Sequence, residues 1–135
     1  SGQRAVVVAA RSGHADVLKA LLDKDSSQVD ATDNRGWAAL HWTADVDGPV
    51  GDSGEAVRVL LGAGADVNVK ATNKPCHTPL HVAVGRRIAS GGTIRALLKG
   101  GANIHARARR GHTPLHRACR RSNVSGVELL LSWGA

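Results

Sequence analysis

The chain has 135 residues, of which 42% are hydrophobic and 21% charged. This length and composition predict one globular domain, and they exclude both a multidomain enzyme and a disordered segment. The formal net charge is +7, but residues 1–67 hold 6 Lys+Arg against 10 Asp+Glu, whereas residues 68–135 hold 12 against 1. Such an asymmetry concerns partners rather than fold, because a basic half attracts acidic molecules.

The cysteine content and the lack of long apolar runs indicate where the chain functions. Cys76 and Cys119 form neither a disulfide framework nor a Cys-x-x-Cys pair, so a reducing compartment, cytoplasm or nucleus, is expected. No run reaches the roughly 18 apolar residues of a membrane span, so we expect no membrane insertion. The chain lacks Met, opens with Ser1-Gly2 and stops inside a repeat, which indicates a piece of a longer protein.

The chain repeats itself with a period of 34 to 40 residues. The motif Thr-Pro-Leu-His occurs at 78–81 and 113–116, and in weaker form at 38–41. A second motif, two leucines followed by a glycine, occurs out of phase at 60–64, 97–101 and 130–134. We assign four repeats at approximately 1–32, 33–70, 71–107 and 108–135. Extra residues at 47–54 and 90–92 are interpreted as loop insertions.

Each repeat is expected to contain two helices and an extended loop. Thr followed by Pro favours a helix start, because the hydroxyl accepts a backbone N–H and Pro needs no donor in the first turn. First helices of about ten residues are therefore predicted to begin near Ala38, Thr78 and Thr113. Second helices, with apolar residues at helical spacing, are predicted near residues 54, 92 and 124. Each ends at a glycine suited to a left-handed cap.

With Thr-Pro-Leu-His-x-Ala and Leu-Leu-x-x-Gly-Ala-Asp-Val-Asn at this period, the whole chain resembles the ankyrin repeat family. The resemblance implies an all-α, ankyrin-type helix-turn-helix solenoid with hairpin fingers. It further implies a concave binding face formed by the fingers and the first helices. Repeat 1 is degenerate, and Ala38-Ala39 replaces Thr-Pro in repeat 2 at a cost of roughly 1 kcal/mol. The N-terminal half is therefore expected to fray first.

Seven histidines and two cysteines raise the question of metal binding or catalysis. In His77-x-x-x-His81 and His112-x-x-x-His116 the first histidine precedes the helix, so the pair does not share a helical face and no metal site is expected. The resemblance gives His41, His81 and His116 a structural role. Cys119 is expected to be a buried, inert thiol, and Cys76 lacks a base with an orienting group. We predict neither enzymatic activity nor a cofactor.

Arginine dominates the basic half of the chain. Its planar fork of donors pairs with carboxylate or phosphate, and the resemblance directs helix ends and finger tips to the concave side. Trp37 and Trp42 are candidate interface anchors, although Trp42 can instead pack into the next repeat; Trp133 is expected to cover a helix end. The predicted partner-binding residues are Arg86, Arg87, Arg107, Arg109, Arg110, His112, Arg117, Arg120, Arg121, Trp37 and Trp42.

These observations predict a non-catalytic protein-interaction module that binds an acidic peptide or protein surface in the groove of repeats 3 and 4. Nucleic-acid or phosphoinositide binding by the same arginines is the alternative, but the chain lacks the interleaved aromatics of a base-stacking surface. A structural spacer within a larger enzyme or channel is a third possibility, and a spacer needs no coherent patch. A small-molecule partner is not expected.

Overall fold

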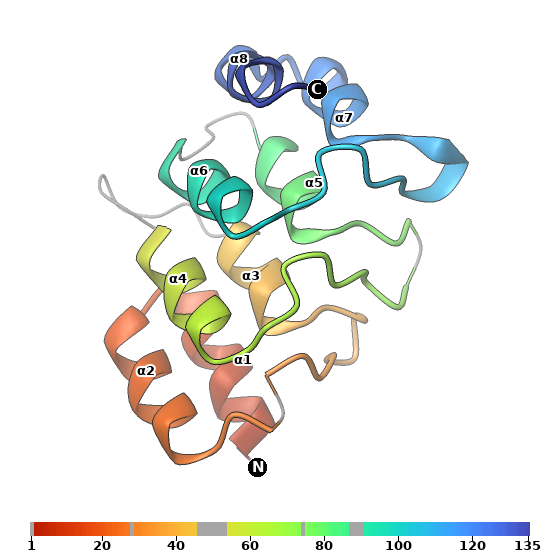
Figure 1. The fold of residues 1–135 in the computed structure, drawn as a ribbon. Coiled ribbons are helices and arrows are strands. Elements are labelled where there is room, and N and C mark those ends of the chain that lie inside the picture. Colours follow the sequence, from red (N-terminus) through yellow and green to blue (C-terminus); the bar gives the residue numbers. More distant parts are fainter. Residues whose placement is uncertain (1, 28, 46–53, 74, 87–90) are drawn as a thin grey trace.

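A computed structural model describes residues 2–27, 29–45, 54–73, 75–86 and 91–135, with the side chains of 2–4 left out (Figure 1). Helices are the only regular elements in these ranges; the α-helices follow one another in pairs, and a short 3-10 helix, η1 (Arg109–Gly111), lies between α6 and α7. The pairs are α1 (Gly2–Ser12) with α2 (Ala15–Lys24), α3 (Ala39–Asp45) with α4 (Gly54–Gly62), α5 (Pro79–Val84) with α6 (Gly91–Lys99), and α7 (Pro114–Arg120) with α8 (Val124–Ser132).

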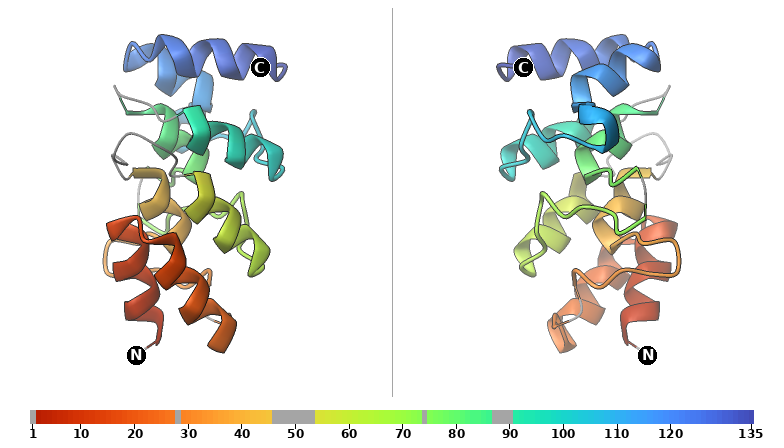
Figure 2. Two further views of the ribbon diagram at one scale, coloured as in Figure 1. Left: turned by 90° about the vertical axis from the view of Figure 1, so that its left-hand side faces the viewer. Right: turned by 90° about the vertical axis from the view of Figure 1, so that its right-hand side faces the viewer.

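The helix pairs stack into a two-layer solenoid. Along the first layer α1 packs on α3, α3 on α5 and α5 on α7; along the second, α2 packs on α4, α4 on α6 and α6 on α8. Figure 2 shows the pairs rising in order from the N-terminus to the C-terminus, and Figure 1 shows the connecting fingers projecting away from the second layer. The predicted all-α solenoid with fingers is confirmed.

The predicted helix starts are confirmed to within one residue, but two of the first helices are shorter than expected. The helices α5 and α7 have 6 and 7 residues instead of about ten, and α3 is described over Ala39–Asp45. In repeat 3 the helix ends at Gly85. In repeat 4 it ends before Ser122, whose φ of 55° lies in the left-handed region and does not continue a helix.

The Thr-Pro start is confirmed in atomic detail. The backbone N–H of His81 donates to the Thr78 hydroxyl (3.4 Å), and the N–H of Thr78 donates back to Nδ1 of His81 (3.2 Å). The same reciprocal pair joins Thr113 and His116. In repeat 2 the N–H of Ala38 still donates to Nδ1 of His41 (3.1 Å), although no hydroxyl is present there. The histidine therefore preserves half of the cap where Thr has been lost.

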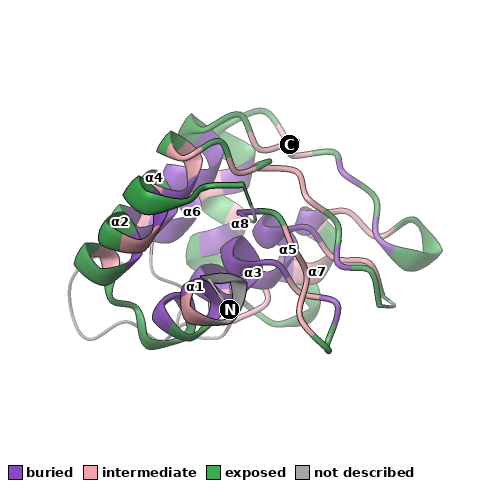
Figure 3. Cartoon of the chain, turned by 90° about the horizontal axis from the view of Figure 1, so that it is seen from below, coloured by how far each residue is buried: buried purple, intermediate pink, exposed green. Residues whose placement is uncertain are grey.

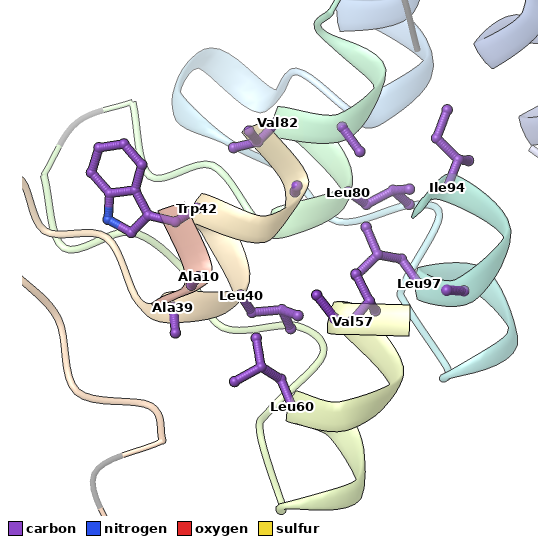
Figure 4. Packing of buried hydrophobic residues seen from close by; sticks show 14 of the residues in the cluster. Ala10, Ala39, Leu40, Trp42, Val57, Leu60, Leu80, Val82, Ile94 and Leu97 are labelled. Carbon is purple, nitrogen blue, oxygen red and sulfur yellow. The ribbon is translucent and has the colours of Figure 1, made fainter. Parts of the chain in front are cut away.

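The core lies between the two layers (Figures 3 and 4). Leu40 and Leu80 from the first layer meet Val57, Leu60 and Leu97 from the second, and all are almost completely buried. Burying each such leucine stabilises the fold by roughly 1.5–3 kcal/mol. Because every pair contributes to one continuous core, the stack positions neighbouring fingers and first helices at a fixed spacing.

The fingers are joined to one another by backbone hydrogen bonds. The N–H of Thr72 donates to the carbonyl of Gly36 (2.9 Å), and the N–H of Arg109 donates to the carbonyl of Pro75 (2.9 Å). Gly36 has φ +76°, and an added Cβ would lie 2.5 Å from Oγ1 of Thr72. Only glycine allows this close approach, so the fingers of repeats 2 and 3 lie in direct contact.

Candidate binding groove of repeats 3 and 4

Motif histidines determine how successive fingers sit on the first helices. Nδ1 of His81 accepts the N–H of Thr78, so its Nε2 carries the proton and donates to the carbonyl of His112 (2.9 Å) in the next finger. His41 makes the equivalent bond to the carbonyl of His77 (2.8 Å). The expected structural role is confirmed for these two histidines, and it places His77 and His112 at the bases of adjacent fingers.

Between these fingers and α7 lies a hollow of about 320 Å³, which we call the Arg pocket. Two imidazoles from the fingers and three guanidinium groups from α7 and its C-cap line it: His77, His112, Arg117, Arg120 and Arg121. No carboxylate is among these lining residues. The two imidazoles stack on the motif histidines behind them, with ring centroids 5.3 Å apart for His77 and His81, and 5.7 Å apart for His112 and His116.

Arg117 is the most constrained of the three arginines. Its Nε donates to the carbonyl of His81 (2.9 Å), which ties α7 to α5. The guanidinium lies over Gly85, where an added Cβ would come within 2.2 Å of Nε. Because Gly85 has no side chain, the Arg117 guanidinium can lie against its backbone.

Burial and, after it, nearby positive charge lower the pKa of two groups in the pocket, Arg117 and His77. Burial lowers the pKa of Arg117, and the neighbouring Arg121 and Arg120 lower it further, against an opposing effect of Asp45. Burial, together with Arg117 and the surrounding histidines, lowers the pKa of His77 to about 4. At pH 7 the His77 ring is therefore neutral and adds no positive charge to the pocket.

The other predicted arginines divide into three groups. Arg107, Arg109 and Arg110 are exposed in the finger of repeat 4, outside the lining of the Arg pocket. Arg86 binds the Asp45 carboxylate through Nη1 (2.7 Å) and also the Asp45 backbone carbonyl, so it links repeats 2 and 3. Arg87, residues 47–53 of the first predicted insertion and residue 90 of the second lie outside the described residues. Gly54 begins α4, and Gly91 and Gly92 begin α6, which corrects the assignment of these three residues to loops.

The two candidate tryptophan anchors pack against each other in repeat 2, with ring centroids 4.7 Å apart. Trp42 is only 8% exposed, and its indole N–H donates to Oδ2 of Asp33 (2.6 Å). The Arg11 guanidinium lies 4.7 Å from the Trp42 ring. The expectation that Trp42 is an exposed anchor is thus corrected. Its side chain contacts Asp33 of its own finger and Arg11 of repeat 1. Trp37 is half-buried.

Two other predictions concern exposed or reactive groups. Cys119 is exposed, which corrects the expected buried thiol. The equivalent residue in repeat 3, Val84, is fully buried because α5 has α3 on one side and α7 on the other. In repeat 4, α7 packs on α5 and α8, and no further first helix in the described chain covers Cys119.

Trp133 caps the end of α8 and is 44% exposed. No group of three or more metal-binding side chains occurs among the described residues.

Sequence reasoning included His112 but left His77 out of the partner-binding set. The signal was present, since both residues directly precede Thr-Pro and so occupy equivalent positions in adjacent fingers. The sequence analysis also gave no role to Gly85, because its contact with Arg117 joins residues 32 positions apart in the chain.

Comparison with known proteins identifies the repeat type. A family model described as ankyrin repeats, in three copies, matches residues 1–71 and 49–135. Ankyrin repeat and SOCS box protein 16 of Homo sapiens is 32% identical over 123 residues, covering 62% of this chain and 27% of that protein. The nuclear factor NF-kappa-B p105 subunit of Mus musculus is 31% identical over 137 residues, covering 99% of this chain and 13% of that protein.

A shorter similarity involves an ankyrin repeat and LEM domain-containing protein 1 homolog of Caenorhabditis elegans, 42% identical over 64 residues, which cover 47% of this chain and 9% of that protein. The chain thus spans between 9% and 27% of the length of these three relatives. None of the helices described is long and apolar enough to cross a membrane.

Proposed function

Because this chain belongs to the ankyrin repeat family, we propose that it binds an acidic peptide or acidic protein surface in the groove of repeats 3 and 4. Ankyrin repeats are generally protein–protein interaction modules and are typically non-catalytic. The same proposal places the protein in the cytoplasm or nucleus. It adds to the family's general function a chemical class of partner and a position on the solenoid.

The Arg pocket is the observation that carries the proposal. Three guanidinium groups and two imidazoles converge from two fingers and one helix, with no carboxylate among the described residues of the lining. Like charges held this close repel one another, and an anionic partner would relieve that repulsion. A structural spacer would need no such convergence, which argues for recognition.

Different arginines are expected to contribute in different ways. Arg117 is already held by the His81 carbonyl, so it loses little side-chain entropy when a partner binds. Arg120 and Arg121 are exposed, and each should contribute modestly and be screened by salt. Arg107, Arg109 and Arg110 on the neighbouring finger, with His112 at its base, would extend the basic surface and accelerate association.

The experiment measures binding of a fluorescein-labelled, nine-residue Asp/Glu-rich peptide by fluorescence anisotropy. We expect the double variant R120E/R121E to lose at least tenfold in affinity. The matched control is R95E/K99E, which makes the same charge change at exposed positions on α6. Equal losses in both variants would reduce the effect to net charge and would contradict a localised groove.

Binding of a random DNA duplex, measured in parallel, tests the nucleic-acid alternative, which the exposed finger arginines favour. Peptide affinity should fall several-fold between about 50 and 200 mM salt, whereas a duplex neutralised at six or more phosphates would lose roughly a thousandfold. Tight, sequence-independent duplex binding with the steeper slope would replace the proposed function by the alternative.

A further inference from the structure

We infer that the Arg pocket is a subsite for one phosphorylated side chain, a phosphoserine or phosphothreonine, carried by the acidic segment that the groove binds. The inference rests on the proposed function and makes it more specific. Four features of the pocket support it: size, charge, the fixed position of Arg117 and position between the fingers.

The size of the pocket fits a single side chain. Its volume is about 320 Å³, and the walls come from two finger bases and the end of α7. An α-helix, with its roughly 10 Å diameter, does not fit into such a space. An extended peptide lying along the finger bases can instead insert one side chain.

The charge of the pocket favours phosphate over carboxylate. Three arginines line it, and the His77 ring beside them is neutral at pH 7 because its pKa is lowered to about 4. A carboxylate has one negative charge and two acceptor oxygens, whereas a phosphorylated side chain has about −1.5 to −2 charge and three acceptor oxygens. The doubly charged group neutralises more of the repulsion and uses more of the donors.

Arg117 is positioned to form a two-pronged contact. Its Nε is used by the His81 carbonyl (2.9 Å), and Gly85 leaves space for the guanidinium plane. Within the described residues, its two terminal NH₂ groups donate no hydrogen bond. A planar guanidinium fixed at one side and open at the other is suited to pair two donors with two phosphate oxygens.

The position of the pocket favours a peptide over a membrane lipid. The pocket lies at the bases of fingers whose tips project beyond the first helices (Figures 1 and 3). A flat bilayer would meet the finger tips before its headgroups reached Arg117. An extended peptide, about 5 Å wide as a strand in a sheet, can instead lie along the finger bases, on the side where α7 lies.

The test compares three fluorescein-labelled peptides of one acidic sequence that differ at a central residue: serine, aspartate or phosphoserine. At about 150 mM salt we expect the phosphoserine peptide to bind at least tenfold more tightly than the aspartate peptide. If all three bind equally, the phosphate subsite is wrong and the acidic groove stands. If none binds, both proposals are wrong.

Two variants that leave the net charge unchanged locate the subsite. G85A pushes the Arg117 guanidinium from its seat, and R117K retains the charge but removes the fork; each should reduce the preference for phosphoserine to below threefold. The matched control is G62A, at a helix end where nothing lies within 4 Å of the added Cβ. Circular dichroism melting checks that each variant is folded.

A preference that persists unchanged in both folded variants would place the phosphate elsewhere and overturn the inference. Vesicles containing a phosphoinositide and a random DNA duplex complete the set of probes. Tighter binding to either than to the phosphoserine peptide would also overturn it.

Discussion

Repeats 2 and 4 place different side chains at the same position of one motif, directly after the motif histidine. In repeat 2 this residue is Trp42, which is buried and donates its indole N–H to Asp33 of its own finger (2.6 Å). In repeat 4 it is Arg117, whose Nε donates to the His81 carbonyl and whose guanidinium lines the Arg pocket. The motif therefore fixes the backbone position of this residue. The neighbouring residues determine whether its side chain is buried within the fold or lines a surface hollow.

The contrast continues at the position four residues after the histidine. Asp45 of repeat 2 is paired with Arg86 of repeat 3, whereas Arg120 of repeat 4 is exposed and lines the Arg pocket. Gly85 occupies this position in repeat 3 and makes room for Arg117. The polar groups at these two positions of repeat 2 are thus paired within the fold, whereas Arg120 of repeat 4 is exposed.

The largest expected difference in unfolding free energy and in peptide affinity is between the variants W42A and R117A. Removing a buried tryptophan should lower the free energy of unfolding by about 3–5 kcal/mol, while the folded fraction keeps its affinity for the acidic peptide. R117A should cost about 1 kcal/mol or less and should weaken binding at least fivefold. Urea denaturation and peptide anisotropy on both variants provide the measurement. A larger loss of unfolding free energy in R117A than in W42A would contradict this prediction.

A smaller difference in the free energy of unfolding is expected between the variants H81A and H116A. Both histidines cap their own helix, but His81 is fully buried and also donates to the next finger, whereas His116 is exposed. We expect H81A to lower the free energy of unfolding by about 3 kcal/mol and H116A by about 1 kcal/mol, because H81A leaves buried partners unsatisfied. Equal losses would show that the bond between repeats adds nothing.

Acid should destabilise the folded state by protonating three histidines whose pKa is lowered in the fold, His41, His77 and His81. Burial lowers the pKa of His41 and of His81 below the usual 6.5, so the unfolded chain binds protons first as the pH falls. The unfolding free energy should be nearly constant above pH 7 and decrease below about pH 6.5, continuing to pH 4, near which His77 titrates. Urea titrations at pH 7.5, 6.0 and 5.0 check the sign. In H81A the decrease should be shallower, and a profile as steep as that of wild type would assign it to other groups.

The smallest expected change is a gain of about 1 kcal/mol in A38T. A threonine at this buried position would give repeat 2 the hydroxyl that Thr78 provides in repeat 3, where it contacts Nδ1 of His81 (2.8 Å). Hydrogen exchange should show slower amides in α3 of the variant. Unchanged exchange and stability would mean that the back-bond from Ala38 to His41 already suffices.

Local sequence chemistry predicted the helices because their starting signals are local. Thr-Pro followed by His defines the first turn of α5 and α7 without reference to the rest of the chain. The site was less predictable, because its parts depend on residues far apart in the sequence. The Arg86–Asp45 pair spans 41 positions, and pairing with Asp33 buries Trp42; neither produces a periodic pattern.

The burial of the fourth repeat was mispredicted for a related reason. Cys119 was expected to be buried by analogy with small residues at its position in other repeats. Burial in a stack depends on the neighbouring repeat, and the same residue type becomes exposed where no further helix covers it.

The central claim is that acidic partners bind repeat 4 and not repeat 2, and amide chemical shifts can locate the contact directly. In a titration of ¹⁵N-labelled protein with the acidic peptide, the largest changes should fall on His77, His112 and residues 117–122. The finger of repeat 2, from Asp33 to Trp42, should change little. Largest changes in that finger, or small changes spread evenly over all four repeats, would contradict the account.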